Sequence, residues 1–262
     1  MGAISFSIDV DLVAFLARHL PFEVFVETGT FEGESIDRVK PYFNRFYSVE
    51  LSEHYWGLSK KRFEDDPMVI IKNGHAPVFL KELMPELKGK SVLFWLDSHW
   101  CDANATGGAA SQCALLEELK AIDALNGDSV VLIDDARLFL CSPGIPHDYT
   151  QWPDLNAIIG TLHEKSNAHE LMVINDVIMY FPRRLKDQVR NYGHNQGVDW
   201  LTIADMYRQA ADVIAELGAK ESEIKSLKLE NTILVGETRI KENEINNMFS
   251  VAEQRLFIIN QF

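Results

Sequence analysis

Acidic and imidazole side chains follow two apolar stretches of the chain at the points where those stretches end. They are Asp97 and His99 after SVLFWL (91–96), and Asp134 and Asp135 after SVVLI (129–133). An imidazole titrates near neutral pH and can accept a proton from a substrate hydroxyl. Carboxylate oxygens are the ligands that a hard cation such as Mg²⁺ prefers. This set predicts a site with Asp97 and His99 as catalytic residues, and a divalent cation held by Asp97, Asp134 and Asp135.

Short apolar runs that alternate with helical patterns must position these side chains. The expected strands are 23–27, 45–49, 68–71, 91–96 and 129–133, with helices at 53–63, 77–87 and 108–125. Such alternation is typical of a parallel sheet with crossover helices on both faces. Two further apolar runs flank Asn175-Asp176 and predict an antiparallel hairpin. We therefore expect an α/β, Rossmann-like doubly wound sheet of seven strands, mostly parallel, with an antiparallel last strand.

The expected fold brings the carboxylates together at one place on the sheet. In open parallel sheets, ligands bind outside the carboxyl ends of the strands. Asp97, Asp134 and Asp135 should meet there, and three carboxylates repel one another unless they are solvated or paired with a cation. This reasoning favours a metal-assisted reaction at the sheet edge. The alternatives are that Asp97 binds a cofactor or caps a helix, and that His99 is a structural hydrogen-bonding residue.

A glycine turn follows the first expected strand in FVETGTFEGESI, with the spacing Glu27-x-Gly29-x-x-x-Gly33. Glycine permits positive φ and a close approach of the backbone to a ligand, and the next helix offers free N–H groups. Glu50, at the end of the second strand, is placed to bind the hydroxyls of a ribose. The turn lacks the GxGxxG of dinucleotide-binding proteins. Together these features predict a crevice that binds an adenosyl group.

These motifs, together with KNGHA (72–76), resemble the cofactor motifs of class I S-adenosylmethionine-dependent methyltransferases over residues 20–182. The resemblance implies S-adenosylmethionine as cofactor. It places the methionine end against the first turn, the ribose against Glu50 and the adenine beside the third strand. The implied cofactor-binding residues are Glu27, Thr28, Gly29, Thr30, Gly33, Glu50, Asn73, Gly74, His75 and Asp97.

LDSHW and LIDDARL are similar to the metal-binding segments of catechol O-methyltransferase-like enzymes. That resemblance implies Mg²⁺ on Asp97, Asp134 and Asp135. The chain departs from the family pattern twice: Ser98 is inserted between the aspartate and the histidine, and Cys101 replaces the family's catalytic lysine. His99 is then the expected base, with Asp102 and His147 in reserve.

The character of the sequence changes after the polar stretch 182–197, which we expect to be a connector. Two sets of residues lie seven apart: Leu217, Ile224, Asn231, Thr238 and Ile245, and Leu227, Leu234, Lys241 and Met248. This heptad pattern predicts a long helix that forms a coiled coil and makes a homo-oligomer, and Asn231 would help to set its register. The alternative is a long helix packed on its own domain. The expected domains are a methyltransferase domain at 1–197 and a helical oligomerisation segment at 198–262.

Charge and composition restrict the partners and the compartment. The net charge of −14 argues against a surface for nucleic acid. The N-terminus lacks the pattern of a signal peptide, and no run approaches the roughly 18 apolar residues of a membrane span. Three cysteines without a CxxC motif indicate reduced thiols. We expect a cytoplasmic protein without a transmembrane segment, peripheral to the inner membrane if an assembly recruits it.

Chelation needs two neighbouring oxygens on the acceptor, which a sugar diol or a catechol provides. The sequence resembles methyltransferases of bacterial surface-glycan pathways, which implies O-methylation of a sugar in a surface polysaccharide or glycolipid. Alternatives are a catechol-type or other small-molecule O-methyltransferase, a nucleotide-sugar oxidoreductase, and a non-catalytic coiled-coil scaffold. The missing GxGxxG and Tyr-x-x-x-Lys motifs count against the oxidoreductase.

Overall fold

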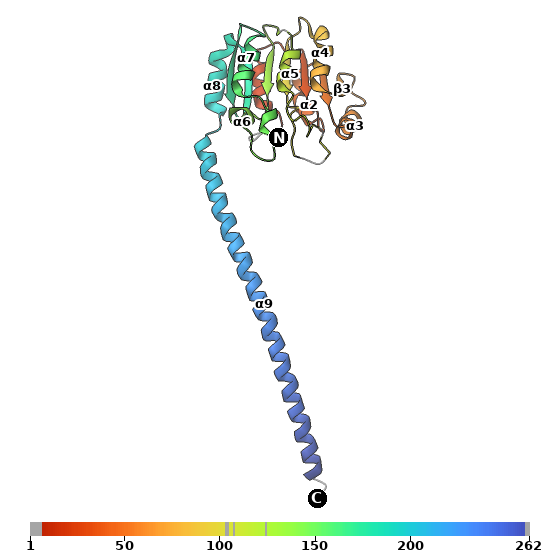
Figure 1. The fold of residues 1–262 in the computed structure, drawn as a ribbon, viewed down its shortest axis with the longest axis vertical. Helices are drawn as coiled ribbons and strands as arrows, with labels where there is room; N and C mark the ends of the chain where they lie inside the picture. Colours follow the sequence, from red (N-terminus) through yellow and green to blue (C-terminus); the bar gives the residue numbers. More distant parts are fainter. Residues whose placement is uncertain (1–6, 103–104, 107, 124, 260–262) are drawn as a thin grey trace. The chain divides into compact units, whose positions relative to one another are not determined.

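The computed structural model describes residues 7–102, 105–106, 108–123 and 125–259. The chain divides into two compact units, Met1–Val198 and Asp199–Phe262 (Figure 1). The expectation about a signal peptide rests partly on residues 1–6, which lie outside the described residues.

The first unit alternates strands and helices. Its strands are β1 Val24–Thr28, β2 Arg45–Glu50, β3 Val69–Asn73, β4 Val92–Leu96, β5 Val130–Ile133, β6 His169–Ile174 and β7 Val177–Pro182. Its helices are α1 Val10–Ala17, α2 Glu34–Val39, α3 Glu53–Arg62, α4 Ala76–Leu87, α5 Leu115–Ala121, α6 Arg137–Leu140, α7 Leu155–His163 and α8 Lys186–Gln196. Three short 3-10 helices complete it: η1 Lys40–Tyr42, η2 Tyr149–Gln151 and η3 Arg183–Leu185.

The strands form one seven-stranded sheet in the order β3-β2-β1-β4-β5-β7-β6. Strands β1 to β5 run parallel, while β7 pairs antiparallel with β5 and β6. The predicted fold class is therefore confirmed. Thr28 pairs with both Val49 and Leu96, so β1, β2 and β4 end at the same edge of the sheet. The strand order reverses between β1 and β4, which is where open α/β sheets form their ligand crevice.

Alternating side chains of the buried strands enter two cores, one on each face of the sheet. In β1, Val26 joins the core that contains Leu80 of α4 and Leu119 of α5. Its neighbour Phe25 joins the core that contains Leu16 of α1 and Val189 of α8. Because successive side chains of a strand point to opposite faces, a run such as VFV supplies both cores at once. This explains why the central strands β4 and β5 are apolar on both faces, with helices on each side of the sheet (Figure 1).

Two segments differ from the sequence-based expectation. The stretch 182–197, predicted as a polar connector, contains η3 and α8, whose Val189 and Tyr192 are buried. Two apolar residues three apart are enough to attach this otherwise polar helix to the core. The helix predicted at 108–125 is shorter: α5 spans Leu115–Ala121, and the described residues between Gly108 and Ala114 form turns beside the crevice instead.

The second unit contains α9, a single helix of 60 residues from Trp200 to Ile259 (Figure 1). The predicted long C-terminal helix is thus confirmed, and the coiled coil stays a prediction. Within the described part of the chain, none of the helices combines the length and apolar character needed to cross a bilayer.

Candidate functional site

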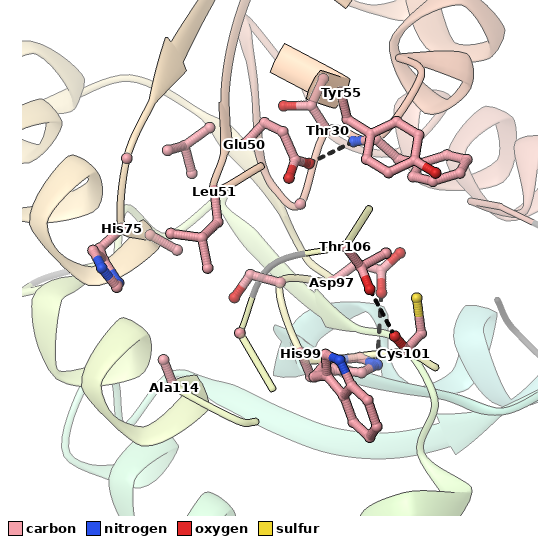
Figure 2. Close-up of a pocket in the computed structure, with 18 of the residues that line it drawn as sticks. Thr30, Glu50, Leu51, Tyr55, His75, Asp97, His99, Cys101, Thr106 and Ala114 are labelled. Carbon is pink, nitrogen blue, oxygen red and sulfur yellow. Dashed lines mark hydrogen bonds and ion pairs between the residues drawn. The ribbon is translucent and has the colours of Figure 1, made fainter. Parts of the chain in front are cut away.

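A cavity of about 450 Å³ opens at the carboxyl ends of β1, β2 and β4. Its size is typical of a pocket for a small ligand or cofactor. Eight residues predicted from the sequence line it: Gly29, Thr30, Glu50, Gly74, His75, Asp97, His99 and Asp135. Figure 2 shows Thr30 and Glu50 near one end of this cavity, with Asp97 and His99 toward the other. The two halves of the predicted site therefore share one space.

Gly29 brings the turn after β1 against the end of β4. Its φ is 85°, and a Cβ at this position would lie 2.2 Å from the Asp97 carbonyl oxygen. The Gly29 N–H donates to the Val49 carbonyl at 2.9 Å. Only glycine meets both demands, because other residues are strained at this φ and would collide with the β4 backbone. This close approach brings the candidate cofactor turn beside Asp97.

Glu50 is fixed at the cavity by two backbone donors. Its Oε2 accepts from the Phe31 N–H and its Oε1 from the Ser52 N–H, each at 2.8 Å. Each oxygen keeps a further lone pair for a ligand hydroxyl. The rings of Phe31 and Tyr55 pack with centroids 4.1 Å apart, and both residues line the cavity. Figure 2 shows Tyr55 near Glu50. The sequence analysis missed these two aromatic residues, because only the fold brings them together.

Glu27 lies beneath the turn and is absent from the cavity lining of the described chain. It is fully buried, and its Oε2 accepts from the Ser48 hydroxyl, which also bonds to the Thr30 hydroxyl. Burial raises its pKa to about 7, and the charge of Glu50 adds to the rise, against the hydrogen bonds from Ser48 and Ser35. As placed, Glu27 supports the turn through Ser48 and Thr30.

Other predicted cofactor residues also shape the backbone around the cavity. The Thr28 hydroxyl accepts from the Asp97 N–H at 3.3 Å. Gly33 caps the start of α2 with φ 81°. The Asn73 amide donates to the Glu50 carbonyl oxygen at 2.9 Å and ties β3 to β2. Gly74 and His75 follow directly and reach the cavity.

His99 joins the two strand ends that carry the acids. Its Nε2 lies 2.9 Å from Asp135 Oδ2 and 3.6 Å from Asp97 Oδ1. Burial lowers the pKa of His99, but the hydrogen bond to Asp135 and the charges of Asp97 and Asp135 together raise it. In the tautomer in which the His99 Nε2–H donates a hydrogen bond to Asp135, Nδ1 is unprotonated and can accept a proton from a substrate. His99 and Asp135 therefore form a dyad that can hold and move a proton.

Arg137 balances the charge of this dyad from the other side. Its Nη1 lies 2.6 Å from Asp135 Oδ1 and also contacts Asp176, in the turn between β6 and β7. Burial opposes ionisation of Asp135, yet its hydrogen bond with His99 and the charges of His99 and Arg137 hold its pKa below its usual value. Asp135 also has a left-handed φ of 54°, and such strain is typical of functional sites.

The inserted Ser98 turns toward the interior, and its hydroxyl donates to Glu118 of α5. Glu118 is buried, and this burial raises its pKa despite hydrogen bonds from Ser98 and Thr28. This contact anchors the residue between Asp97 and His99. A signal for Glu118 existed in the sequence, because it lies between Leu115 and Leu119 on the buried face of a helical pattern.

Asp97 and Asp134 are two further acids at this end of the cavity. Burial raises the pKa of Asp97 well above its usual value, and the charge of Asp134 adds to the rise. Burial, reinforced by the charge of Asp135, raises the pKa of Asp134 to about 6, and its Oδ2 is buried without a hydrogen-bond partner in the described structure. Such a pair either shares a proton or attracts a cation.

The three predicted metal ligands do not form a metal site as their side chains stand. Asp135 is engaged through both oxygens, by His99 and by Arg137. Across the described residues, no cluster of three or more Asp, Glu, His or Cys side chains is arranged to hold a metal ion. A cation bound by all three aspartates would compete with His99 and Arg137 for the Asp135 oxygens.

Comparison with known proteins leaves the family open. No protein-family model and no curated protein matches the chain. Several hundred solved chains match the structure. A Klebsiella pneumoniae protein provisionally described as an O-methyltransferase is 12% identical, with a TM-score of 0.44 over 68% of this chain and 82% of that one. A Streptococcus mutans protein provisionally described as a methyltransferase, solved with SAH, is 12% identical, with a TM-score of 0.45 over 67% and 98%. At such identities and TM-scores, the likeness decides neither family nor activity.

The segment 141–154, between α6 and α7, is tied to the turns before α5 by hydrogen bonds to Gln112. Gln112 Oε1 accepts from the Trp152 indole N–H at 3.1 Å and from the Asp148 N–H at 2.8 Å. The buried Trp152 also packs on His99 and His147, with ring centroids 5.5 and 5.1 Å away. Trp152 thus anchors the loop to the core, and Trp100 is the tryptophan that lines the cavity.

Proposed function

We propose that this chain is an S-adenosylmethionine-dependent O-methyltransferase that methylates a hydroxyl group of a sugar. The observation that carries the proposal is the shared cavity. The turn at Gly29, the carboxylate of Glu50 and the His99–Asp135 dyad all open into it. A binding module would need the first two features but not the dyad.

The cavity has the chemistry that S-adenosylmethionine requires. The close turn at Gly29 lines the cavity, Glu50 offers two fixed carboxylate oxygens, and Phe31 and Tyr55 supply apolar surface. Bound there, the cofactor supplies a methyl group activated by a sulfonium centre. Glu50 would hold the ribose, and Gly74 with His75 would lie beside the adenine.

The chain contributes proton transfer and positioning. His99, oriented by its hydrogen bond to Asp135, accepts the proton of the acceptor hydroxyl. Asp135 stays ionised beside Arg137 and stabilises the imidazolium that forms. The Ser98–Glu118 contact and the Gly29 turn keep Asp97 and His99 at the cavity wall. Positioning two substrates in one enclosed space supplies most of the rate gain.

A sugar of a surface polysaccharide or glycolipid is the acceptor that we propose. Trp100, next to His99 in the chain, lines the cavity and gives a flat apolar surface on which a pyranose face can pack. We further propose a cytoplasmic enzyme that self-associates through α9. A catechol or another small hydroxylated molecule is the alternative acceptor.

Calorimetry with S-adenosylmethionine, and with NAD⁺ as comparison, tests the cofactor. We expect binding of S-adenosylmethionine only; no binding would exclude a methyltransferase, and binding of NAD⁺ instead would favour the oxidoreductase. Transfer of a labelled methyl group is then measured on panels of glycans and catechols. Cofactor binding without transfer to any acceptor would favour a scaffold that kept the pocket.

Replacing Glu50 by glutamine should weaken S-adenosylmethionine binding by about 10- to 100-fold, the contribution of a hydrogen bond to a charged group. The amide also loses one acceptor for the Phe31 or Ser52 N–H. Glu53→Gln, three residues away on the exposed start of α3, is the matched control and should bind normally. Equal affinities for the two variants, measured by calorimetry, would remove Glu50 from the cofactor site.

Metal assistance is tested by turnover in chelator. Because Asp135 is already engaged by His99 and Arg137, we expect the rate to persist when divalent cations are removed. Loss of turnover in EDTA that Mg²⁺ restores would instead support the metal site predicted from the sequence. Asp134→Asn distinguishes metal-independent from metal-dependent turnover further. Only in a metal-dependent enzyme should this substitution raise the Mg²⁺ concentration needed for full activity.

A further inference from the structure

Helix α9 exposes a large apolar surface. From Ala204 to Glu253 every side chain of the helix is exposed, including Leu217, Ile224 and Leu234, each more than half accessible. Soluble monomers rarely expose so much apolar surface, and a helix of this length takes most of its stability from packing. The helix therefore needs a partner, and its sequence specifies which one.

The apolar side chains repeat along a single seam. We define the seam by heptad positions a and d. The a positions are Ile203, Ala210, Leu217, Ile224, Asn231, Thr238, Ile245 and Ala252, and the d positions are Met206, Val213, Lys220, Leu227, Leu234, Lys241 and Met248. Isoleucine at a, with leucine at d in the central heptads, favours two parallel strands. A seam continuous over so many heptads fits another helix of the same length and pattern.

Asn231 sets the register and direction of this pairing. It is the single asparagine in the seam, at an a position with Leu227 and Leu234 on either side. When two copies run parallel and in register, the two Asn231 amides meet and bond to each other. A shift by one heptad would separate the two amides and place one of them against Ile224 without a hydrogen-bond partner, which costs free energy. A reversal would set a positions against d positions, so the two amides would no longer meet.

The charges beside the seam favour the same arrangement. Five successive g positions are acidic: Glu216, Glu223, Glu230, Glu237 and Glu244. Antiparallel helices would set g against g and oppose these glutamates. Parallel helices set g against the e position of the next heptad, where Glu223 meets Lys228. Parallel pairing thus replaces repulsion with an ion pair at this level.

The two lysines within the seam complete the pattern. In parallel pairing, two g positions still face an acidic e position of the other copy: Glu216 faces Glu221, and Glu237 faces Glu242. The seam lysines Lys220 and Lys241 lie beside these two pairs. Within one chain, Lys220 already lies 2.6 Å from Glu216. A lysine at d can extend its ammonium to the edge of a two-stranded seam, where it neutralises these glutamates. In a seam of three or more strands its charge would be more deeply buried.

We propose that α9 forms a parallel, in-register, two-stranded coiled coil with a second copy of this chain, and that Asn231 specifies it. The coil joins two 1–198 units, so that one assembly carries two cavities. This inference deepens the self-association proposed above and does not depend on the methyl-transfer chemistry.

The experiment measures the mass of the full chain by sedimentation equilibrium, without cofactor. We expect a dimer, and Leu227→Asp at a d position should raise its dissociation constant by at least about 100-fold. Leu229→Asp, two residues away at the outward f position, is the matched control and should stay dimeric. A monomeric wild type, a trimer or tetramer, or equal effects of the two variants would overturn the proposal.

Direction is tested by oxidation of single cysteine variants. Met248→Cys, at a d position near the far end of the seam, should form a disulfide-linked dimer, because parallel copies bring these two residues together. Ser250→Cys, at the f position of the same turn, should crosslink no more than the wild type with its native cysteines. Absence of the Met248→Cys crosslink in a dimer would show the helices to be antiparallel or out of register. Loss of S-adenosylmethionine binding, by contrast, would affect only the proposed function.

Discussion

Replacement of His99 by glutamine is expected to lower kcat by about 10²- to 10⁴-fold, the range of general base catalysis. The cofactor affinity should be unchanged. In the proposed reaction the imidazole accepts the proton at the cavity wall, and its Nε2 lies 2.9 Å from Asp135. Glutamine keeps a side chain that can bond to Asp135 but removes the group that titrates. Single-turnover transfer of labelled methyl, with calorimetry of the same variant, separates the chemical step from binding.

His147→Gln is the matched control for this experiment. His147 packs on Trp152 and Trp100 in the same aromatic cluster, and its Nδ1 lies 3.1 Å from the Gly144 carbonyl oxygen. We expect it to keep most of the activity. If His147→Gln lost as much activity as His99→Gln, or if His99→Gln turned over at the wild-type rate, His99 would not be the base.

The dependence on pH gives a second readout of the dyad. A base must be neutral to act, so kcat/KM should rise as pH increases through the raised pKa of His99. Asp135→Asn removes the negative charge beside His99 and should move this acid limb to lower pH. For stability the sign is opposite. The His99–Asp135 pair stabilises the fold fully below the unfolded pKa of histidine, and this contribution is lost as pH rises through the folded pKa.

Local patterns were enough to predict the scaffold of this site. The strands at 45–49 and 91–96 are found within a residue of their predicted ends, because a run that is apolar on both faces is informative without any tertiary context. The same holds for the turn at Gly29 and the acid at Glu50. Helix α8 was missed, although the spacing of Val189 and Tyr192 carried its signal.

The contacts that define the chemistry depend on residues far apart in the chain. His99 meets Asp135 across 36 positions, and Arg137 meets Asp176 across 39. Each residue could be singled out from its place after a strand, but not the partner that its side chain selects. Three aspartates at strand ends suggested a metal, whereas the fold places an imidazole and a guanidinium on Asp135. Sequence spacing thus predicted the location of the site better than its electrostatics.

Gly29→Ala should have the largest effect on the cofactor turn. An alanine at φ 85° costs about 1–2 kcal/mol in strain, and its Cβ would press against the Asp97 carbonyl oxygen. We expect a loss of at least about 2 kcal/mol in the free energy of unfolding, which lowers Tm by roughly 4–8 °C. The ends of β1 and β4 must separate to make room for the alanine side chain, and this distorts the turn. S-adenosylmethionine binding should therefore also fall below detection. Thermal unfolding and calorimetry measure the two losses.

Gly57→Ala separates this effect from the ordinary consequences of removing a glycine. Gly57 lies within α3, where a Cβ would meet no other atom within 4 Å. Alanine should therefore raise stability by about 0.5–1 kcal/mol and leave cofactor binding intact. The same substitution then has opposite signs at two positions, because only one of them requires a left-handed backbone against a neighbouring strand. A Gly29→Ala variant as stable as wild type and able to bind S-adenosylmethionine would show that this close approach is not what forms the cofactor site.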